Sequence, residues 1–130
     1  MRGLLLDSCV YIDMADGDER VADALAAARR VYFSAIALGE LLAGFQPGER
    51  GESKRAMLER FIATSGARIL PVRQQTADAY AALFKHCKQH GRMIPQNDLW
   101  IAATALEYGL TILTADRHFT ELPVECVLLE

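Results

Sequence analysis

The sequence has 130 residues, is 52% hydrophobic and carries a formal net charge of -3. This size and apolar content fit a single globular domain with one continuous core, and the slight acidity excludes a generally basic nucleic-acid-binding surface. Three separated cysteines without a CxxC pair favour a reduced, cytoplasmic protein. The apolar run at residues 3–6 stops at Asp7, far short of a signal peptide or membrane span, so we expect neither export nor membrane association.

Buried strands and amphipathic helices alternate along the first half of the chain. Continuous apolar runs predict strands over residues 3–6 and 31–33. Apolar residues at helical spacing predict helices over residues 18–30, 35–45 and 57–62. Ser34 is a candidate N-terminal cap of the second of these helices.

The same alternation continues through the second half. Apolar runs predict strands over residues 68–72, 111–114 and 126–129. The proline in the first of these strands indicates a sheet edge or an early strand end. Helical spacing predicts a helix around residues 80–87 that closes at Gly91. A last helix is expected to begin at a cap formed by Asn97 or Asp98 and to end at Gly109.

This order of elements predicts an α/β fold. Crossovers between strands through helices make the strands parallel, so we expect a three-layer α/β/α sandwich with a central parallel sheet of about five strands. In such a sheet, ligands bind beyond the C-terminal ends of the strands. Asp7 and Asp116 each follow a predicted strand, and we therefore expect both at that edge.

Two more carboxylates are candidates for the same site. Asp98 would reach this edge if its helix leads directly into the strand that precedes Asp116. Glu40 lies inside a strongly apolar helix, where an ionised carboxylate needs a cation, a hydrogen-bond network or solvent access. Each acid taken singly could instead be a turn, cap or surface residue, but their joint placement favours one acidic cluster.

An acidic cluster without a set of histidines or thiols suits an oxygen-preferring cation, Mg²⁺ or Mn²⁺, rather than zinc. Such an ion activates water and neutralises charge that develops on a phosphodiester, which indicates hydrolytic phosphodiester cleavage. Ser8 and Thr114 carry hydroxyls close to Asp7 and Asp116. These hydroxyls could orient a carboxylate or a metal-bound water, or they could cap backbone groups.

Four segments resemble, in order, the motifs of the PIN domain, and especially of VapC-type toxin ribonucleases from bacterial toxin–antitoxin pairs. The segments are residues 6–13 (LDSCVYID), 34–41 (SAIALGEL), 97–105 (NDLWIAATA) and 113–119 (LTADRHF). The resemblance implies one PIN-like nuclease domain over residues 1–130, which uses a metal-bound water as nucleophile. The catalytic metal ligands that it implies are Asp7, Glu40, Asp98 and Asp116. It also implies an RNA substrate, a cognate antitoxin and a homodimer.

Three positions need separate interpretation. Ser8 stands where the family often has threonine, which keeps the hydroxyl. His118 stands where some members carry a further acid, which leaves the number of metal ions open. Trp100 could stack on a base, but on an alanine-rich helix we favour a core or dimer contact.

A local basic stretch precedes the third motif. It contains Lys85, His86, Lys88, His90 and Arg92. The lysines and the arginine could contact RNA phosphates beside the cleavage site. We favour the simpler interpretation, in which these cations lie on a solvated helix end and complement the helix dipole.

Two other function classes fit parts of the pattern. A phospho-receiver or phosphatase-like α/β domain also has an aspartate after its first strand. Such domains usually need a second acid close by and a lysine after a later strand, whereas Asp7 is followed by Ser8 and Cys9 and no such lysine occurs. A catalytically idle PIN-like binding module is the other alternative, and the intact acid set argues against it. The sequence does not identify the RNA target.

Overall fold

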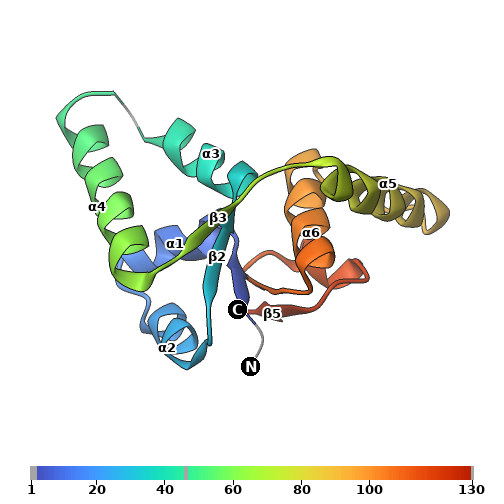
Figure 1. Cartoon of the computed structure of the whole chain (residues 1–130), viewed down its shortest axis with the longest axis horizontal. Coiled ribbons are helices and arrows are strands. Elements are labelled where there is room, and N and C mark those ends of the chain that lie inside the picture. The colour runs from blue at the N-terminus through green and yellow to red at the C-terminus, as the bar shows by residue number, and fades with distance from the viewer. Residues whose placement is uncertain (1–2, 46, 130) are drawn as a thin grey trace.

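The computed structural model describes residues 3–45 and 47–129. Five strands form one sheet in the order β3-β2-β1-β4-β5, and all four neighbouring pairs are parallel (Figure 1). The strands are β1 (Leu4–Leu6), β2 (Val31–Ser34), β3 (Arg68–Leu70), β4 (Thr111–Thr114) and β5 (Cys126–Leu128). The predicted parallel sheet is confirmed, and the strand that precedes Pro71 does lie at an edge.

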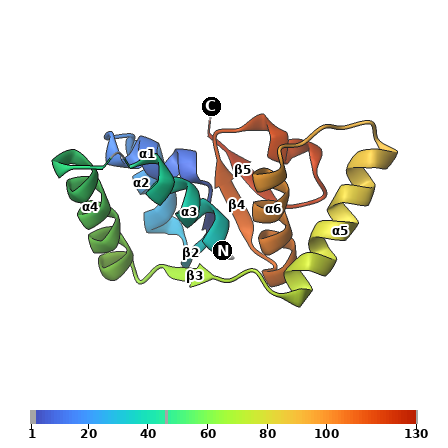
Figure 2. The same ribbon diagram turned by 90° about the horizontal axis from the view of Figure 1, so that it is seen from above.

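Within the described part of the chain, six α-helices and one 3-10 helix connect the strands. They are α1 (Ser8–Ala15), α2 (Glu19–Ala27), α3 (Ala35–Gly44), α4 (Glu49–Ser65), α5 (Gln74–Gln89), α6 (Gln96–Tyr108) and the 3-10 helix η1 (Arg117–Glu121). Helices α4 and α5 lie at opposite ends of the molecule, with the sheet between them (Figure 2). Within the described residues, no helix combines the length and the apolar character needed to cross a bilayer.

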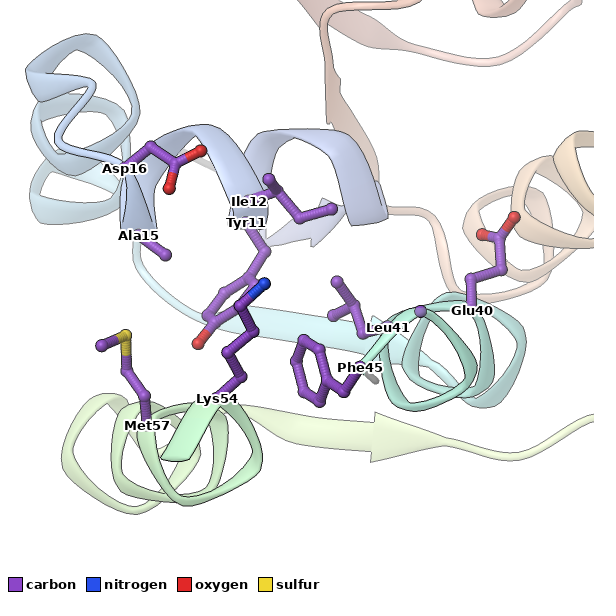
Figure 3. A pocket seen from close by; sticks show the side chains of 10 residues that line it. Tyr11, Ile12, Ala15, Asp16, Glu40, Leu41, Phe45, Lys54 and Met57 are labelled. Carbon is purple, nitrogen blue, oxygen red and sulfur yellow. The ribbon is translucent and has the colours of Figure 1, made fainter. Parts of the chain in front are cut away.

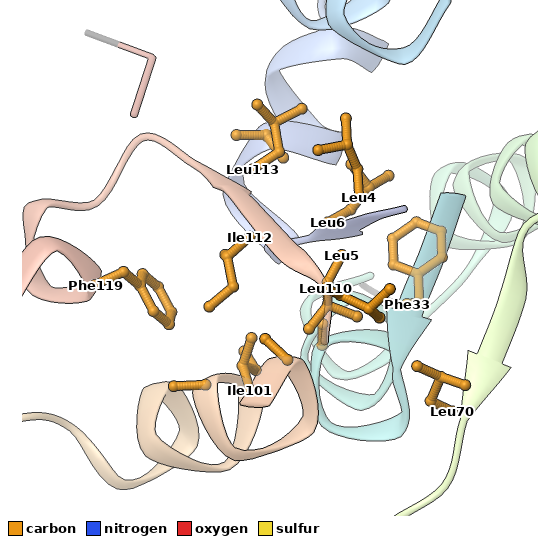
Figure 4. Packing of buried hydrophobic residues seen from close by; sticks show 14 of the residues in the cluster. Leu4, Leu5, Leu6, Phe33, Leu70, Ile101, Leu110, Ile112, Leu113 and Phe119 are labelled. Atoms are coloured by element: carbon orange, nitrogen blue, oxygen red, sulfur yellow. The ribbon is translucent and has the colours of Figure 1, made fainter. Parts of the chain in front are cut away.

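Both faces of the central strands are covered. All three residues of β1 are buried, and successive strand residues point to opposite faces, so neither face of β1 meets solvent. Figure 4 shows Leu4 and Leu113 on the side of α1, and Ile112 on the side of α6, where it approaches Ile101 and Phe119. The sheet is therefore the middle layer of the predicted sandwich.

The strand register aligns the C-terminal ends of the central strands. Leu6 of β1 pairs with Phe33 of β2 and with Leu113 of β4. The residues that follow these positions, Asp7, Ser34 and Thr114, consequently meet at one edge. The predicted placement of Asp7 at this edge is confirmed, because its backbone N–H donates a 3.0 Å hydrogen bond to the carbonyl of Leu113.

The start of α3 and the end of α6 are set by the residues that the sequence predicts, Ser34 and Gly109. The hydroxyl of Ser34 accepts a 3.0 Å hydrogen bond from the backbone N–H of Ala37, so Ser34 does cap α3. Gly109 ends α6 in the left-handed conformation, at a φ of 65° that favours glycine.

The predicted cap of the last helix is wrong. Helix α6 begins at Gln96 directly after Pro95, which takes the cap position without a side-chain hydrogen bond. Asn97 and Asp98 therefore lie in the first turn, where their side chains contact other elements instead of the backbone of their own helix. Two further helices, α1 and η1, are not predicted by the sequence pattern and start immediately after Asp7 and Asp116.

Helix α6 is held in place by α5. The rings of Tyr80 and Trp100 stack with centroids 4.0 Å apart, so Trp100 contributes to packing between the two helices. The carboxylate of Glu107, whose side chain is 5% exposed, accepts hydrogen bonds from the Thr76 hydroxyl and from Nε of Arg73, the latter 2.6 Å long. These contacts fix the helix whose first turn carries Asp98.

Candidate active site

The hydroxyl of Thr114 joins two of the predicted acidic residues. Thr114 is the last residue of β4, and its side chain is fully buried. Its Oγ1 donates a 2.8 Å hydrogen bond to Oδ2 of Asp7 and accepts a 2.9 Å hydrogen bond from the backbone N–H of Asp116. One side chain thus fixes both the Asp7 carboxylate and the start of the turn that carries Asp116.

Asp7 is a buried carboxylate at the junction of β1 and α1, with 5% of its surface exposed. Its Oδ1 caps α1 by accepting a 2.8 Å hydrogen bond from the backbone N–H of Ser8. The thiol of Cys9 donates to Oδ2 over 3.2 Å, beside the bond from Thr114. Because both oxygens are engaged, the orientation of this carboxylate is set before any ligand binds.

A second group brings together Asp98, Asp116 and His118. Nδ1 of His118 lies 3.3 Å from Oδ2 of Asp98 and 3.2 Å from Oδ1 of Asp116. The same Asp116 oxygen caps η1 by accepting a 2.9 Å hydrogen bond from the backbone N–H of His118. Among the described residues, this is the one set of three metal-binding side chains whose ligand atoms all lie within 4.8 Å of one another.

Asp98 links the two groups electrostatically. Burial raises the pKa of its carboxyl above the ordinary value, and the negative charges of Asp7 and Asp116 raise this pKa further. The contact with His118 acts in the opposite direction. Because His118 joins Asp98 to Asp116 and Thr114 joins Asp116 to Asp7, the three aspartates form one acidic cluster.

Glu40 reaches the edge of this cluster from α3. The hydroxyl of Ser8 donates to its Oε1 over 3.3 Å, and the side-chain amide of Asn97 donates to its Oε2 over 3.4 Å. Of the three ways to stabilise this charge that the sequence left open, the structure shows two: hydrogen bonds from Ser8 and Asn97, and partial exposure to solvent. The same contacts connect α3 to the first turns of α1 and α6.

The four predicted acids are therefore brought to one edge, but they are not equivalent. Asp98 and Asp116 share a group with His118, Asp7 is joined to Asp116 through Thr114, and Glu40 lies one hydrogen bond away at Ser8. Both predicted hydroxyls contact a carboxylate, as the first interpretation of Ser8 and Thr114 requires, and Thr114 also accepts from a backbone N–H, as the second interpretation requires.

The cations predicted to contact RNA lie away from the acidic cluster. Helix α5, which carries Lys85 and Lys88, is at the end of the molecule beyond α6 (Figure 2). Nζ of Lys88 lies 5.7 Å from the centre of the Phe84 ring, and Arg92 forms a 3.0 Å ion pair with Glu121 of η1. RNA contact by these three cations stays a prediction.

Sequence reasoning missed the contacts made by Cys9 and Asn97, and treated His118 only as a departure from a motif. Each of these residues lies one or two positions from a predicted acid. That proximity was the available signal, because side chains next to a strand-end carboxylate share its edge of the sheet. Burial and the nearby Asp7 charge raise the pKa of the Cys9 thiol to about 11, so this thiol stays protonated and acts as a donor.

A hollow of about 250 Å³ lies beside the acidic cluster, between α1, α3 and α4 (Figure 3). Tyr11, Leu41, Phe45 and Met57 give it a largely apolar lining. Glu40 stands at its rim, and its carboxylate points away from these apolar side chains (Figure 3). The hollow and the acidic cluster are thus neighbours that share Glu40.

The donor set fits a divalent cation. Asp7, Asp98 and Asp116 offer carboxylate oxygens in a partly buried site where their charges repel one another. A divalent cation would offset this repulsion, and carboxylate oxygens are the ligands preferred by hard cations.

The sequence of this chain matches a known protein family. A family model described as "PIN domain" matches residues 4–125. The chain belongs to the PIN-domain family. It is similar to the protein "Ribonuclease VapC5" of Mycobacterium tuberculosis, with 30% identity over 118 residues that cover 91% of this chain and 86% of the relative.

Two further comparisons give a similar protein and a similar solved structure whose names refer to toxins. "Toxin FitB" of Neisseria gonorrhoeae is 37% identical over 90 residues, which cover 66% of this chain and 65% of the relative, just under two thirds of its length. A crystal structure of VapBC-5 from Mycobacterium tuberculosis, described as a member of the VapBC family of toxin-antitoxin systems, superposes with a TM-score of 0.78 at 30% identity. That match covers 99% of this chain and 100% of the other.

We expect Asp98→Asn to raise the thermal unfolding midpoint at about pH 7 in buffer with a chelator. The raised pKa of Asp98 means that its charge destabilises the folded state, and the amide removes that charge. The difference from wild type should shrink as the pH falls through the folded pKa, because wild-type Asp98 then becomes protonated. Differential scanning calorimetry measures this, with Asp23→Asn on the exposed face of α2 as control. An unfolding midpoint of Asp98→Asn below that of the control variant would contradict the conclusion that the Asp98 charge destabilises the folded state.

Proposed function

We propose that this PIN-domain protein is a metal-dependent endoribonuclease and the toxin of a toxin–antitoxin pair. The observation that carries the proposal is the convergence of Asp7, Asp98 and Asp116 at the C-terminal edge of the sheet, organised by the Thr114 hydroxyl. Support also comes from the similarity to a protein named a ribonuclease and to one named a toxin. We place the protein in the cytoplasm.

The cation would be Mg²⁺ or Mn²⁺, held by the three aspartates with Glu40 at the edge. When bound, it would supply charge neutralisation at the phosphodiester and lower the pKa of a water molecule. Thr114 and Cys9 hold the Asp7 carboxylate at the floor of the site, so little rearrangement is needed on binding. Asp116 and His118, whose side chains are 38% and 45% exposed, leave the η1 side open for an RNA phosphate.

In the hydrolysis, an oxygen of water attacks phosphorus as the bond from phosphorus to the leaving ribose oxygen breaks. A carboxylate of the cluster accepts the proton of the attacking water. The Thr114 hydroxyl and the Asp116 backbone N–H keep their mutual hydrogen bond throughout, which keeps Asp7 in place relative to Asp116. Lys85, Lys88 and Arg92 could add weak electrostatic attraction for a long RNA, and their contact with RNA stays a prediction.

We further propose that a segment of a cognate antitoxin occupies the apolar hollow beside the acidic cluster. The partnership is supported by the similarity to a toxin-antitoxin structure. Met57 and Ile12 are each 47% exposed and line the hollow, so apolar surface is available there for a partner. Because the hollow shares Glu40 with the acidic cluster, a segment seated in it would also restrict access of RNA to the aspartates. The homodimer stays a prediction.

The nuclease proposal predicts metal-dependent RNA cleavage that depends on the aspartates. Purified wild-type protein should cleave a mixed-sequence RNA pool with Mg²⁺ or Mn²⁺, and excess chelator should abolish cleavage. Asp7→Asn and Asp98→Asn should each reduce the single-turnover rate by at least about 100-fold, because each removes a charge that stabilises the transition state. Circular dichroism should show both variants folded.

Asp78→Asn, on the exposed face of α5, is the matched control and should cleave at the wild-type rate. Undiminished cleavage in excess chelator, or wild-type rates in both aspartate variants, would overturn the metal mechanism. A wild-type protein that binds Mn²⁺ yet cleaves no RNA in the pool would favour the idle PIN-like module.

The antitoxin proposal predicts a short partner protein encoded beside this chain. Met57→Asp should weaken binding of that partner by at least about tenfold in isothermal titration calorimetry, because a charge is placed in an apolar contact. Met93→Asp is the control, since Met93 is 93% exposed and is not among the residues that line the hollow. Equal affinities of the Met57 variant and wild type would exclude the hollow as the docking site.

A further inference from the structure

We infer that His118 is itself a ligand of the active-site cation and that it shifts the preference of the site from Mg²⁺ toward Mn²⁺. This inference rests on the proposed metal-dependent function of the same site. It adds a nitrogen donor to a set that otherwise consists of carboxylate oxygens.

The first support is the position of the imidazole. Nδ1 of His118 lies 3.2 Å from an oxygen of Asp116 and 3.3 Å from an oxygen of Asp98. Neighbouring ligands of an octahedral ion with bonds of about 2.1 Å lie roughly 3 Å apart. The two spacings around Nδ1 are therefore close to those between adjacent ligands of one cation.

The second support is that the backbone holds the imidazole in this position. The N–H of His118 donates to the carboxylate of Asp116, which caps η1. The next residue, Phe119, is fully buried in the core and anchors the same turn. The backbone of His118 is thus fixed on one side by a carboxylate of the site and on the other by the buried Phe119, and the ring lies beside the two aspartates.

The chemistry of the ring permits ligation without a change in its charge. An ionised carboxylate only accepts hydrogen bonds, so when Asp98 and Asp116 are both ionised the ring faces them with its hydrogen on Nδ1. When the cation binds, that hydrogen leaves Nδ1 and solvent supplies one to Nε2, which leaves the Nδ1 lone pair toward the metal. The His118 side chain is 45% exposed, so solvent can carry this proton between the ring nitrogens.

An imidazole ligand changes which ion the site prefers. Mg²⁺ binds oxygen ligands and retains several waters, whereas first-row transition ions accept imidazole nitrogen readily. Loss of the His118 ring should therefore weaken Mn²⁺ binding more than Mg²⁺ binding. If the ring only donated hydrogen bonds that hold Asp98 and Asp116 together, its loss would affect both ions to the same extent.

The test uses full-length protein loaded with Mn²⁺ at about pH 8, where free imidazole is neutral. Electron spin-echo spectroscopy of the wild type should show modulation from a directly bound nitrogen, and His118→Ala should lack it. Titrations followed by the signal of free Mn²⁺, with Mg²⁺ as competitor, should show at least about tenfold weaker Mn²⁺ binding in His118→Ala. The change in Mg²⁺ affinity should be clearly smaller.

His90→Ala removes an exposed histidine from the end of α5 and is the matched control, with wild-type binding and wild-type modulation expected. His118→Asn, which retains a polar side chain, should also lose the nitrogen modulation. Mn²⁺ that binds wild type without nitrogen modulation, or equal losses for both ions in His118→Ala, would overturn this inference and leave the proposed nuclease intact. Failure of wild type to bind either ion would overturn the proposed function as well.

Discussion

The hydrogen bond from Thr114 to Asp7 is the contact on which the acidic site depends. It joins the ends of two neighbouring strands, β1 and β4, and the same hydroxyl accepts from the backbone of Asp116. Since Thr114 and Asp7 are both buried, their mutual hydrogen bond satisfies groups that would otherwise be costly to bury. The parallel register of β1 and β4 therefore determines the relative positions of Asp7 and Thr114 in the site.

Helices α5, α6 and η1 bring Asp98 and His118 to the same edge of the sheet. Helix α6, held by α5, carries Asp98 to the same edge, and η1, anchored by Phe119, presents His118. Burial of the Asp98 carboxyl and, to a smaller extent, the charges of Asp7 and Asp116 raise its pKa, so ionisation of Asp98 in this site opposes folding. The buried sheet holds these carboxylates at one edge, on strand ends and at the starts of helices.

Much of this arrangement could be predicted from sequence because it follows from hydrophobic pattern. The apolar runs defined five strands, and the rule for parallel sheets placed Asp7 and Asp116 at one edge. The pattern does not show that helices begin directly after both aspartates, because an aspartate after an apolar run is equally compatible with a strand end or a turn. The cap of α6 was misassigned because Asn97 and Asp98 are good capping residues by type, while Pro95 fixes the start of the helix earlier. Contacts such as that of His118 depend on side-chain distances that spacing along the chain does not reveal.

The most direct test of this account compares Thr114→Val with Thr114→Ser in single-turnover RNA cleavage with Mg²⁺ or Mn²⁺. Valine keeps the shape of the side chain but loses the donor to Asp7 and the acceptor for Asp116, whereas serine keeps the hydroxyl. We predict that valine reduces the cleavage rate by at least about tenfold and that serine restores most of it. Cleavage by folded Thr114→Val at the wild-type rate would contradict the claim that this hydroxyl organises the active site.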